Sequence, residues 1–353
     1  MFILSFLGTL IIVSFSFIKE NIRSVIVVLA IILLTLFAGT RNYGVEPDYG
    51  IYIDSFSYCT SFQFEFIDFV LIEPFTFLIP FIAKTLTGNA YFIEFSIFVF
   101  ALVGVSLKIV ACSRHNYFFL SVILYCSYMF FYQEMITIRA GVACGLFLLA
   151  IDDLVYKRDK AYFLKIFIAL LFHYSSIIYF VIWILVRLKI SIRYFYGLLI
   201  SSFLVVLLKI NLVTLLRLDV IFPKVKIYLD ILEIEGGEDV NVFSFRVLIA
   251  LGLFILFAIK FELLDTNPSF LVLFKIHILS LCFFFALSTT ANVFSLRLYD
   301  MLSVAQILVF PYVVNVFKEK WFGYVIIFLI CAINLYYIFG MSGLFNNYSS
   351  WLL

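Results

Sequence analysis

Long apolar runs follow one another along almost the entire chain, and only short polar segments separate them. A run of about 20 apolar residues is long enough for a helix to cross the hydrocarbon core of a bilayer. The chain is 65% hydrophobic and 13% charged, with a mean hydropathy of +1.17. No soluble core can bury this much apolar surface, so we predict an all-α polytopic membrane protein with one membrane domain over residues 1–353.

Twelve of these runs are good candidates for membrane-spanning helices. A further run at 67–86 contains two prolines and three charged residues. Each ionised side chain at the bilayer centre costs about 2.5–3.5 kcal/mol, and proline interrupts helical hydrogen bonding, so we expect this run to form a re-entrant or juxtamembrane helical segment that does not cross the membrane. The twelve runs are 1–18, 24–40, 90–110, 116–133, 138–156, 160–173, 174–189, 194–216, 243–261, 270–288, 297–316 and 321–340.

The distribution of Lys and Arg indicates the orientation, because cytoplasmic loops are enriched in these residues. If 67–86 does not cross, the cytoplasmic side receives most basic clusters, including Lys108, while Glu134 and Arg139 lie outside. If 67–86 crosses, the first two helices and the segment after them change sides. The C-terminus is outside in both topologies. We prefer the first topology because it gathers the polar residues on one face, with outer loops at 41–66 and 217–242.

The segment from residue 40 to residue 54 reads TRNYGVEPDYGIYID, which is the most concentrated group of acidic and aromatic residues in the chain. The carboxylates of Glu46, Asp48 and Asp54 could act as a general base toward a hydroxyl, and Asp48 is the first candidate. The tyrosines and the other carboxylates would bind sugar rings. The alternative is a solvated loop whose aromatic residues lie at the membrane interface. The expected sugar-binding residues are Tyr43, Tyr49, Tyr52, Glu46 and Asp54.

Three arginines are candidates for binding phosphate, since a guanidinium can hold two phosphate oxygens with parallel hydrogen bonds. They are Arg139, Arg297 and Arg41. For Arg139 the alternative is a side chain that extends to the membrane interface to solvate its charge. For Arg297 the alternative is an ion pair with Asp300 on the same helix.

Glu73 and His173 are further candidates for acid–base chemistry. Glu73 precedes Pro74 in an apolar run, so its carboxylate is either buried and paired or at the mouth of a cavity. The alternative is a structural carboxylate that the dipole at a helix N-terminus stabilises. His173 lies between two predicted spans. It could act as a base or a hydrogen-bond donor, although a single histidine is as often structural.

Several kinds of chemistry have no signature in this chain. There is no Walker loop, no GxGxxG motif, no GxSxG motif and no nucleic-acid-binding module. The six cysteines are scattered, without a CxxC pair or zinc-like spacing. We therefore predict no cofactor, no bound metal and no nucleic-acid partner.

Five short motifs occur in order along the chain. They are Arg41…Gly44…Asp48-Tyr49…Tyr52, Glu73-Pro74-Phe75, Ile138-Arg139-Ala140-Gly141-Val142-Ala143, Phe172-His173-Tyr174-Ser175 and Arg297-Leu298-Tyr299. Together they resemble the EpsG/Wzy family of bacterial polymerases of O-antigen, capsule and exopolysaccharide repeat units. The family pattern has Gln after the arginine of the third motif, where this chain has Ala140.

The resemblance implies a membrane-embedded glycosyltransferase of the GT-C type on the periplasmic face of the bacterial inner membrane. Donor and acceptor would be oligosaccharides linked to undecaprenyl pyrophosphate, and membrane lipid and a chain-length regulator protein would be partners. The enzyme would transfer the growing glycan to a sugar hydroxyl of the incoming unit. Pyrophosphate would be bound by Arg139, Arg297 and Arg41, and the acceptor activated by Asp48, His173 or Glu73.

Other functions remain open at this point. An O-antigen ligase would use the same donor, and a single-sugar GT-C transferase would use a polyprenyl-monophosphate sugar. A flippase or another transporter of lipid-linked oligosaccharides belongs to a different class. Transporters commonly contain internal repeats with broken helices at mid-membrane, and the sequence shows no such repeat.

Overall fold

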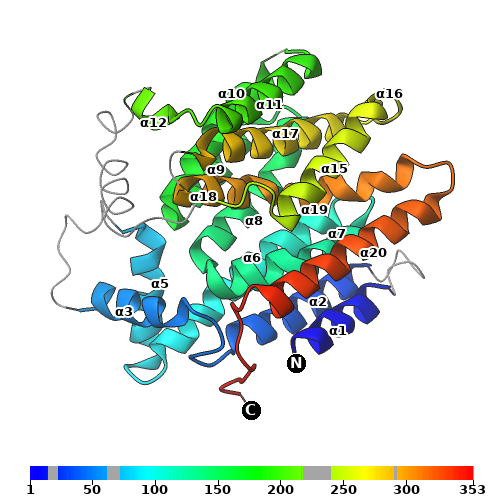
Figure 1. Cartoon of the computed structure of the whole chain (residues 1–353). Helices are drawn as coiled ribbons and strands as arrows, with labels where there is room; N and C mark the ends of the chain where they lie inside the picture. The colour runs from blue at the N-terminus through cyan, green and yellow to red at the C-terminus, as the bar shows by residue number, and fades with distance from the viewer. Residues whose placement is uncertain are drawn as a thin grey trace. The chain divides into compact units, whose positions relative to one another are not determined.

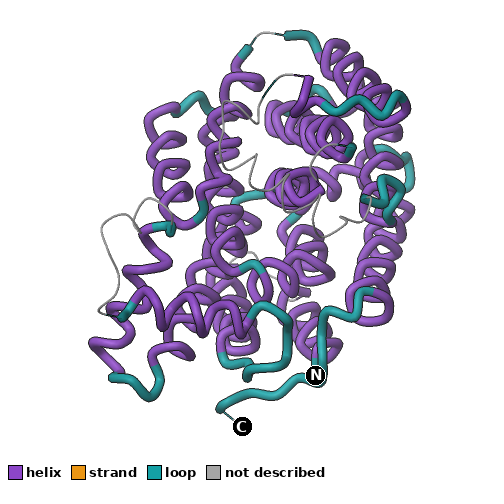
Figure 2. The backbone as a smooth tube through the Cα atoms, turned by 60° about the vertical axis from the view of Figure 1, so that its left-hand side comes forward, coloured by secondary structure: helices purple, strands orange, loops and turns teal. Residues whose placement is uncertain are grey.

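The computed structural model describes residues 1–14, 23–61, 72–188, 190–215, 217, 240–289 and 292–352. Helices connected by loops make up this part of the chain, with no strand (Figure 2), which confirms the all-α class. A helix lies in each of the twelve runs predicted to span the membrane. By length and composition, four helical segments among the described residues can cross a membrane: Phe92–Ser113, Pro268–Ser288, Phe294–Asn315 and Lys320–Met341. The full count of twelve spans and the GT-C architecture stay predictions.

The chain divides into two compact units, Met1–Phe180 with Phe310–Leu353, and Val181–Val309. A single membrane domain stays a prediction. The first unit (Figure 1) contains α1 (Phe2–Ser14), α2 (Arg23–Gly39), α3 (Tyr49–Cys59), α5 (Pro74–Thr87), α6 (Phe92–Ser113), α7 (Phe118–Leu124), the π-helices η3 (Tyr125–Met129) and η4 (Tyr132–Ile136), α8 (Ile138–Val155), α9 (Asp159–Phe172), η5 (Tyr174–Ile177), η6 (Phe310–Asn315), α20 (Lys320–Tyr336) and η7 (Tyr337–Met341). The helix α10 (Ile178–Arg187) contains the boundary. The second unit contains α11 (Ile192–Leu207), α12 (Leu212–Leu215), α15 (Phe245–Ile259), α16 (Phe261–Leu264), α17 (Pro268–Ser288), α18 (Asn292–Ser303) and α19 (Gln306–Val309).

In the first unit, α6 packs against α2, α5 and α8, and α8 packs against α9. Glycines allow two of these helix pairs to approach closely. A Cβ atom on Gly145 of α8 would lie 2.8 Å from Leu107 Cβ of α6, and one on Gly39 of α2 would lie 3.0 Å from the Phe98 backbone. Small residues at such crossings bring helix backbones into contact within membranes. The core around α6 and α8 is therefore tight, and a side chain added at Gly145 or Gly39 would force the helices to shift.

The helix that begins with α7 changes character before it reaches α8. It continues into the π-helical turns η3 and η4, and Thr137 then leaves helical geometry with φ −96° and ψ 56°. The helix α8 starts at the next residue. Turns of π-helix are wider than α-helical turns and occur frequently at functional sites. The break therefore directs attention to the residues around 132–141.

The predicted outer loop 41–66 and the predicted non-crossing segment 67–86 both contain a helix. The segment 41–66 contains α3, an 11-residue helix, and its residues 62–66 lie outside the described part of the chain. The described part of 67–86 is helical from Pro74, which occupies the first turn of α5, where its missing N–H costs no hydrogen bond. Residues 67–71, and residues 218–239 of the second predicted loop, also lie outside the described ranges.

After η7 the chain continues as an extended C-terminal tail, residues 342–352, which lies along residues 40–46. Three backbone hydrogen bonds join them, from Asn42 N to Ser349 O, from Asn346 N to Val45 O and from Trp351 N to Thr40 O, each at 3.0 Å. Both chain ends lie close together in the first unit (Figure 1), where the ring of Phe2 contacts the tail. The tail thus fixes the segment that precedes α3.

Candidate functional site

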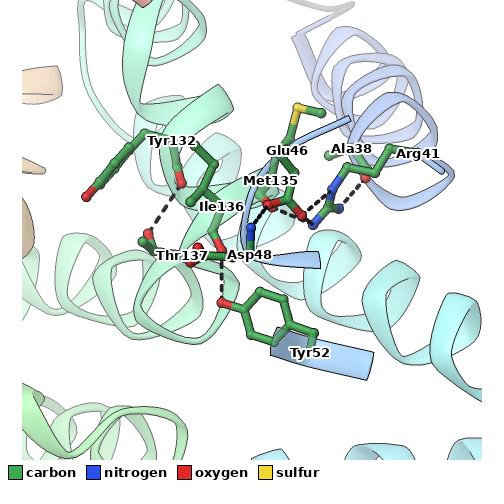
Figure 3. Close-up of polar contacts among 9 residues, drawn as sticks. All are labelled: Ala38, Arg41, Glu46, Asp48, Tyr52, Tyr132, Met135, Ile136 and Thr137. Carbon is green, nitrogen blue, oxygen red and sulfur yellow. Dashed lines mark hydrogen bonds and ion pairs between the residues drawn. The ribbon is translucent and has the colours of Figure 1, made fainter. Parts of the chain in front are cut away.

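The break between η4 and α8 lies beside residues that the sequence had indicated. The last carbonyls of a helix have no donor within the helix itself. Here two side chains of the 41–66 segment supply the donors. Arg41 Nη2 donates to Met135 O at 2.5 Å, and the Tyr52 hydroxyl donates to Ile136 O at 2.9 Å (Figure 3). Arg41 and Tyr52 therefore cap the broken helix that leads into α8.

Arg41 is fully buried, and protein groups surround its guanidinium. Its Nη1 donates to Ala38 O at 2.6 Å, and its Nε and Nη2 lie 3.3 and 3.2 Å from Glu46 Oε1 (Figure 3). The guanidinium also lies 5.6 Å from the centre of the Tyr49 ring. A pyrophosphate would have to displace several of these contacts to reach Arg41. The geometry gives Arg41 a structural role, as a link between the 41–66 segment and η4.

Glu46 connects Arg41 to Asp48. Its Oε2 accepts a hydrogen bond from the backbone N–H of Asp48 at 2.7 Å (Figure 3). Burial raises the pKa of Glu46 above its ordinary 4.5, and the positive charge of Arg41 opposes this rise. Asp48 is half-buried and immediately precedes α3. Glu46 therefore stabilises the turn that presents Asp48; we call residues 41–48 the acidic turn.

Glu73, Arg139 and His173 meet at the ends of three helices. Glu73 precedes α5, Arg139 lies in the first turn of α8, and His173 follows α9. Arg139 Nη1 lies 2.5 Å from Glu73 Oε2, and His173 Nδ1 lies 3.2 Å from Glu73 Oε1. One carboxylate thus binds a guanidinium and an imidazole at the same time. We call these three residues the Glu73 cluster.

Glu73 is ionised at neutral pH. Burial alone would raise its pKa, but the hydrogen bond with His173 and the charge of Arg139 outweigh burial and lower the pKa to about 2. An ionised carboxylate can only accept hydrogen bonds, so the proton of this hydrogen bond belongs to Nδ1 of His173. With the proton held on Nδ1, Nε2 is the ring nitrogen that can accept a proton from a substrate.

Tyr52 connects the Glu73 cluster with the acidic turn. Burial raises the pKa of its hydroxyl to about 12, the charge of Arg139 lowers it and the charge of Asp48 raises it. Both charges therefore act on the same hydroxyl. The sequence had predicted each of these residues separately, and the structure brings them together around Tyr52.

The predicted sugar-binding residues differ in exposure. Tyr43 is 69% exposed, and Asp54 is exposed on α3, so both can contact a ligand from solvent. Tyr49, Tyr52 and Glu46 are 3%, 5% and 4% exposed, which leaves them no surface on which a sugar ring can stack. Their contacts instead support the acidic turn and the break before α8.

Arg297 belongs to the second unit, where it is exposed on α18. Asp300, the helical alternative as a partner for Arg297, forms an ion pair with Arg246, whose Nη1 lies 2.7 Å from Asp300 Oδ1. Arg246 also lies over the ring of Tyr299, 5.2 Å from its centre. The sequence gave no signal for Arg246, because basic residues flank many of the apolar runs.

The sequence also missed a buried ion pair between Lys108 of α6 and Glu134 of η4, whose side chains are 0% and 1% exposed. Charge counting assigned these two residues to opposite sides of the membrane, and this assignment was wrong. The positive-inside rule applies to lysines in loops. A lysine that is neutralised between helices carries no information about orientation.

The chemistry that the Glu73 cluster can perform follows from its members. Arg139 supplies a cation that suits phosphate oxygens, and His173 supplies a base held in one tautomer by Glu73. In the described ranges, no group of three or more His, Cys, Asp or Glu residues comes together in a way that could hold a metal ion.

Comparison with known families agrees with the motifs. No match was found among curated proteins or among solved structures. Residues 24–350 match the EpsG family, a range that includes the acidic turn, the Glu73 cluster and Arg297. This family is associated with glycosyltransferase-like polysaccharide polymerases of the membrane. The motifs had predicted the same family, and with a match over nearly its whole length the chain belongs to the EpsG family.

Proposed function

We propose that this protein joins undecaprenyl-pyrophosphate-linked oligosaccharide repeat units into O-antigen, capsule or exopolysaccharide. Membership of the EpsG family supports the polysaccharide-polymerase class. The observation that carries the mechanism is the Glu73 carboxylate, which bridges Arg139 and His173. The reaction takes place on the periplasmic face of the inner membrane, and a chain-length regulator protein is a proposed partner.

Arg139 binds the pyrophosphate of the donor in this proposal. A guanidinium has five N–H donors, and the ion pair with Glu73 engages the Nη1 atom. The Arg139 side chain is 31% exposed, so a ligand can reach it, in contrast to the fully buried Arg41. A fixed cation beside the leaving group stabilises the negative charge that develops as the glycosidic bond breaks.

The transfer step needs a base for the acceptor hydroxyl. The acceptor oxygen attacks the anomeric carbon of the donor glycan, the bond from that carbon to the pyrophosphate oxygen breaks, and lipid pyrophosphate leaves with the electron pair. The acceptor proton passes to Nε2 of His173. Glu73 holds Nδ1–H and stabilises the imidazolium that forms, as the carboxylate does in other base–carboxylate pairs.

Asp48, the first candidate for this base from the sequence, becomes the second candidate in this proposal. It is half-buried, and its charge acts on the hydroxyl of Tyr52, as the charge of Arg139 does. His173 is preferred because its ring has a defined partner that leaves Nε2 as the basic atom. Tyr43 and Asp54 have the exposed side chains that can orient the acceptor sugar.

The contacts favour the topology in which the segment 41–66 and Arg139 share one side of the membrane. Tyr52 donates a hydrogen bond to Ile136 O, and Asn42 N donates one to Ser349 O in the tail. Groups that share a hydrogen bond cannot lie on opposite sides of a bilayer. The alternative, in which 67–86 crosses, would separate 41–66 from both partners. The distribution of Lys and Arg then supports the periplasm as the shared side.

The proposal is tested by deletion of the gene in its native host and complementation with variants. Surface glycan is resolved by gel, and lipid-linked intermediates are identified by mass spectrometry. We expect single repeat units to persist without the long ladder, and Arg139→Ala to reproduce this state at a normal protein level. Arg193→Ala, which removes an exposed arginine of α11, is the matched control and should restore the ladder.

Other outcomes identify other functions. Full-length polymer stranded on its lipid carrier would indicate a ligase, and repeat units trapped on the cytoplasmic leaflet would indicate a flippase. A full ladder with Arg139→Ala would remove the pyrophosphate-binding role from this residue.

A further inference from the structure

A buried cluster of charged residues contacts the beginning of α8. Lys108 Nζ forms an ion pair with Glu134 Oε1 and donates to Gly141 O at 2.7 Å. The Tyr125 hydroxyl donates to the same Glu134 oxygen at 3.0 Å. Four segments thus meet at two charges, since these residues come from α6, η3, η4 and α8. Gly141 lies two residues after Arg139, so the cluster is attached to the turn that carries the guanidinium.

The backbone around the cluster has no space to adjust. A Cβ atom on Gly104 would lie 2.0 Å from Glu134 Oε2, and one on Gly141 would lie 2.3 Å from Gln133 O. The turn η4 and the start of α8 are therefore pressed against each other and against α6.

Stability alone does not account for this ion pair. Two charges lose their hydration when they are buried, and well-packed apolar residues commonly stabilise a core equally well. Glu134 Oε2 also has no hydrogen-bond partner within the described ranges, which is unfavourable for a buried carboxylate oxygen. The pair instead restricts the relative positions of the helices, because a charge pair with shared hydrogen bonds tolerates only a narrow range of these positions.

We propose that the Lys108–Glu134 pair is a positioning element that holds the first turn of α8 in place and so directs Arg139 toward its ligand. The inference rests on the proposed role of Arg139 in binding pyrophosphate. Neither Lys108 nor Glu134 can contact a substrate, because both side chains are buried. A misplacement of about 1 Å at a catalytic site can reduce the rate about 100-fold, so a small shift of this turn is sufficient.

The test replaces both charges together with Lys108→Met/Glu134→Gln, because a single replacement would leave one buried charge without a partner. Purified protein in nanodiscs is measured in two ways. Hydrogen exchange of the amides of residues 137–142 reports the position of the turn, and titration with inorganic pyrophosphate reports the binding site. We expect exchange about tenfold faster at this turn and pyrophosphate affinity about tenfold lower, with an unchanged far-UV circular dichroism spectrum.

A matched control is available at the opposite end of α8. Asp153 is 1% exposed and pairs with Arg158 and Lys165. Asp153→Asn removes an equally buried acid, but from the far end of α8, and it should leave exchange at 137–142 and pyrophosphate binding unchanged. If the double variant does not accumulate, Tyr125→Phe provides a milder perturbation, with about threefold effects expected in the same direction.

The results separate this inference from the proposed function. Wild-type exchange at 137–142 in a folded double variant, or in Tyr125→Phe if the double variant does not accumulate, would overturn the positioning role, whatever the substrate. Pyrophosphate binding by Arg139→Ala at wild-type affinity would instead overturn the proposed role of Arg139. Faster exchange with weaker binding, and loss of binding in Arg139→Ala, would support both.

Discussion

Replacement of Glu73 by Gln should destabilise the protein, and the size of the effect follows from the pKa. The pKa of Glu73 is lowered from 4.5 to about 2, and this difference corresponds to about 3 kcal/mol at about 1.4 kcal/mol per pH unit. The Arg139 side chain is 31% exposed, so water screens part of the interaction, and we expect a loss of about 2 kcal/mol. For a chain of this size that lowers Tm by roughly 3 °C.

The pH dependence of the difference in Tm tests whether loss of the Glu73 ion pair causes the destabilisation. A carboxyl group with a lowered pKa stabilises the folded state fully above its ordinary pKa, and this contribution disappears as the pH falls toward the folded pKa. The difference in Tm between wild type and Glu73→Gln should therefore be largest above about pH 4.5 and decrease as the pH falls below this value. Thermal unfolding of purified protein in nanodiscs, followed by tryptophan fluorescence, measures this difference.

The control is Glu262→Gln, which makes the same chemical change at an exposed position of α16 in the second unit. It should change Tm by less than about 1 °C, since surface substitutions usually alter stability by no more than about 0.5 kcal/mol. A Glu73→Gln protein that unfolds at the wild-type Tm at neutral pH, or a difference that stays constant down to about pH 3, would refute the ion-pair explanation.

Three further predictions concern single side chains. Arg139→Lys keeps the charge but loses the planar guanidinium that can bind two phosphate oxygens at once, so we expect loss of the polymer ladder at normal protein level. A normal ladder would contradict this two-point binding of phosphate. His173→Gln can still bond to Glu73 but cannot take up a proton, so kcat should fall about 100-fold or more with little change in KM, and a fall of less than tenfold would favour Asp48 as the base. Arg41→Met leaves Glu46 buried without its partner and should cost roughly 3–5 kcal/mol, measured as a lower Tm and less folded protein; wild-type stability would show that the pair is dispensable.

The sequence predicted the helices well because long apolar runs have few alternative structures in a membrane. It also predicted Glu73, Arg139 and His173 individually as site residues. It did not predict that Arg139 and His173 both bind the Glu73 carboxylate. Glu73 is 66 residues from Arg139 and 100 residues from His173, and only the packing of three helix ends brings them together.

The roles of Arg41 and Glu46 could not be derived from the sequence for a different reason. A polar residue that binds a ligand and a polar residue that caps a broken helix have the same appearance in a sequence. The break itself lies in the apolar run 116–133 and the residues after it, where no proline marks the π-helical turns. Because the sequence does not reveal the break, it also does not reveal that Met135 O and Ile136 O need hydrogen-bond donors from another segment.

The C-terminal tail has a consequence for how this chain can change during evolution. Its main contacts with residues 40–46 are backbone hydrogen bonds, which most residue types can form. Alternate residues of an extended segment point to the same side, and Tyr348 and Ser350 both reach the body of the unit, at Phe37 O and the Thr40 hydroxyl. Insertion of one residue would turn both away. Substitutions in the tail should therefore be tolerated more easily than any change in its length.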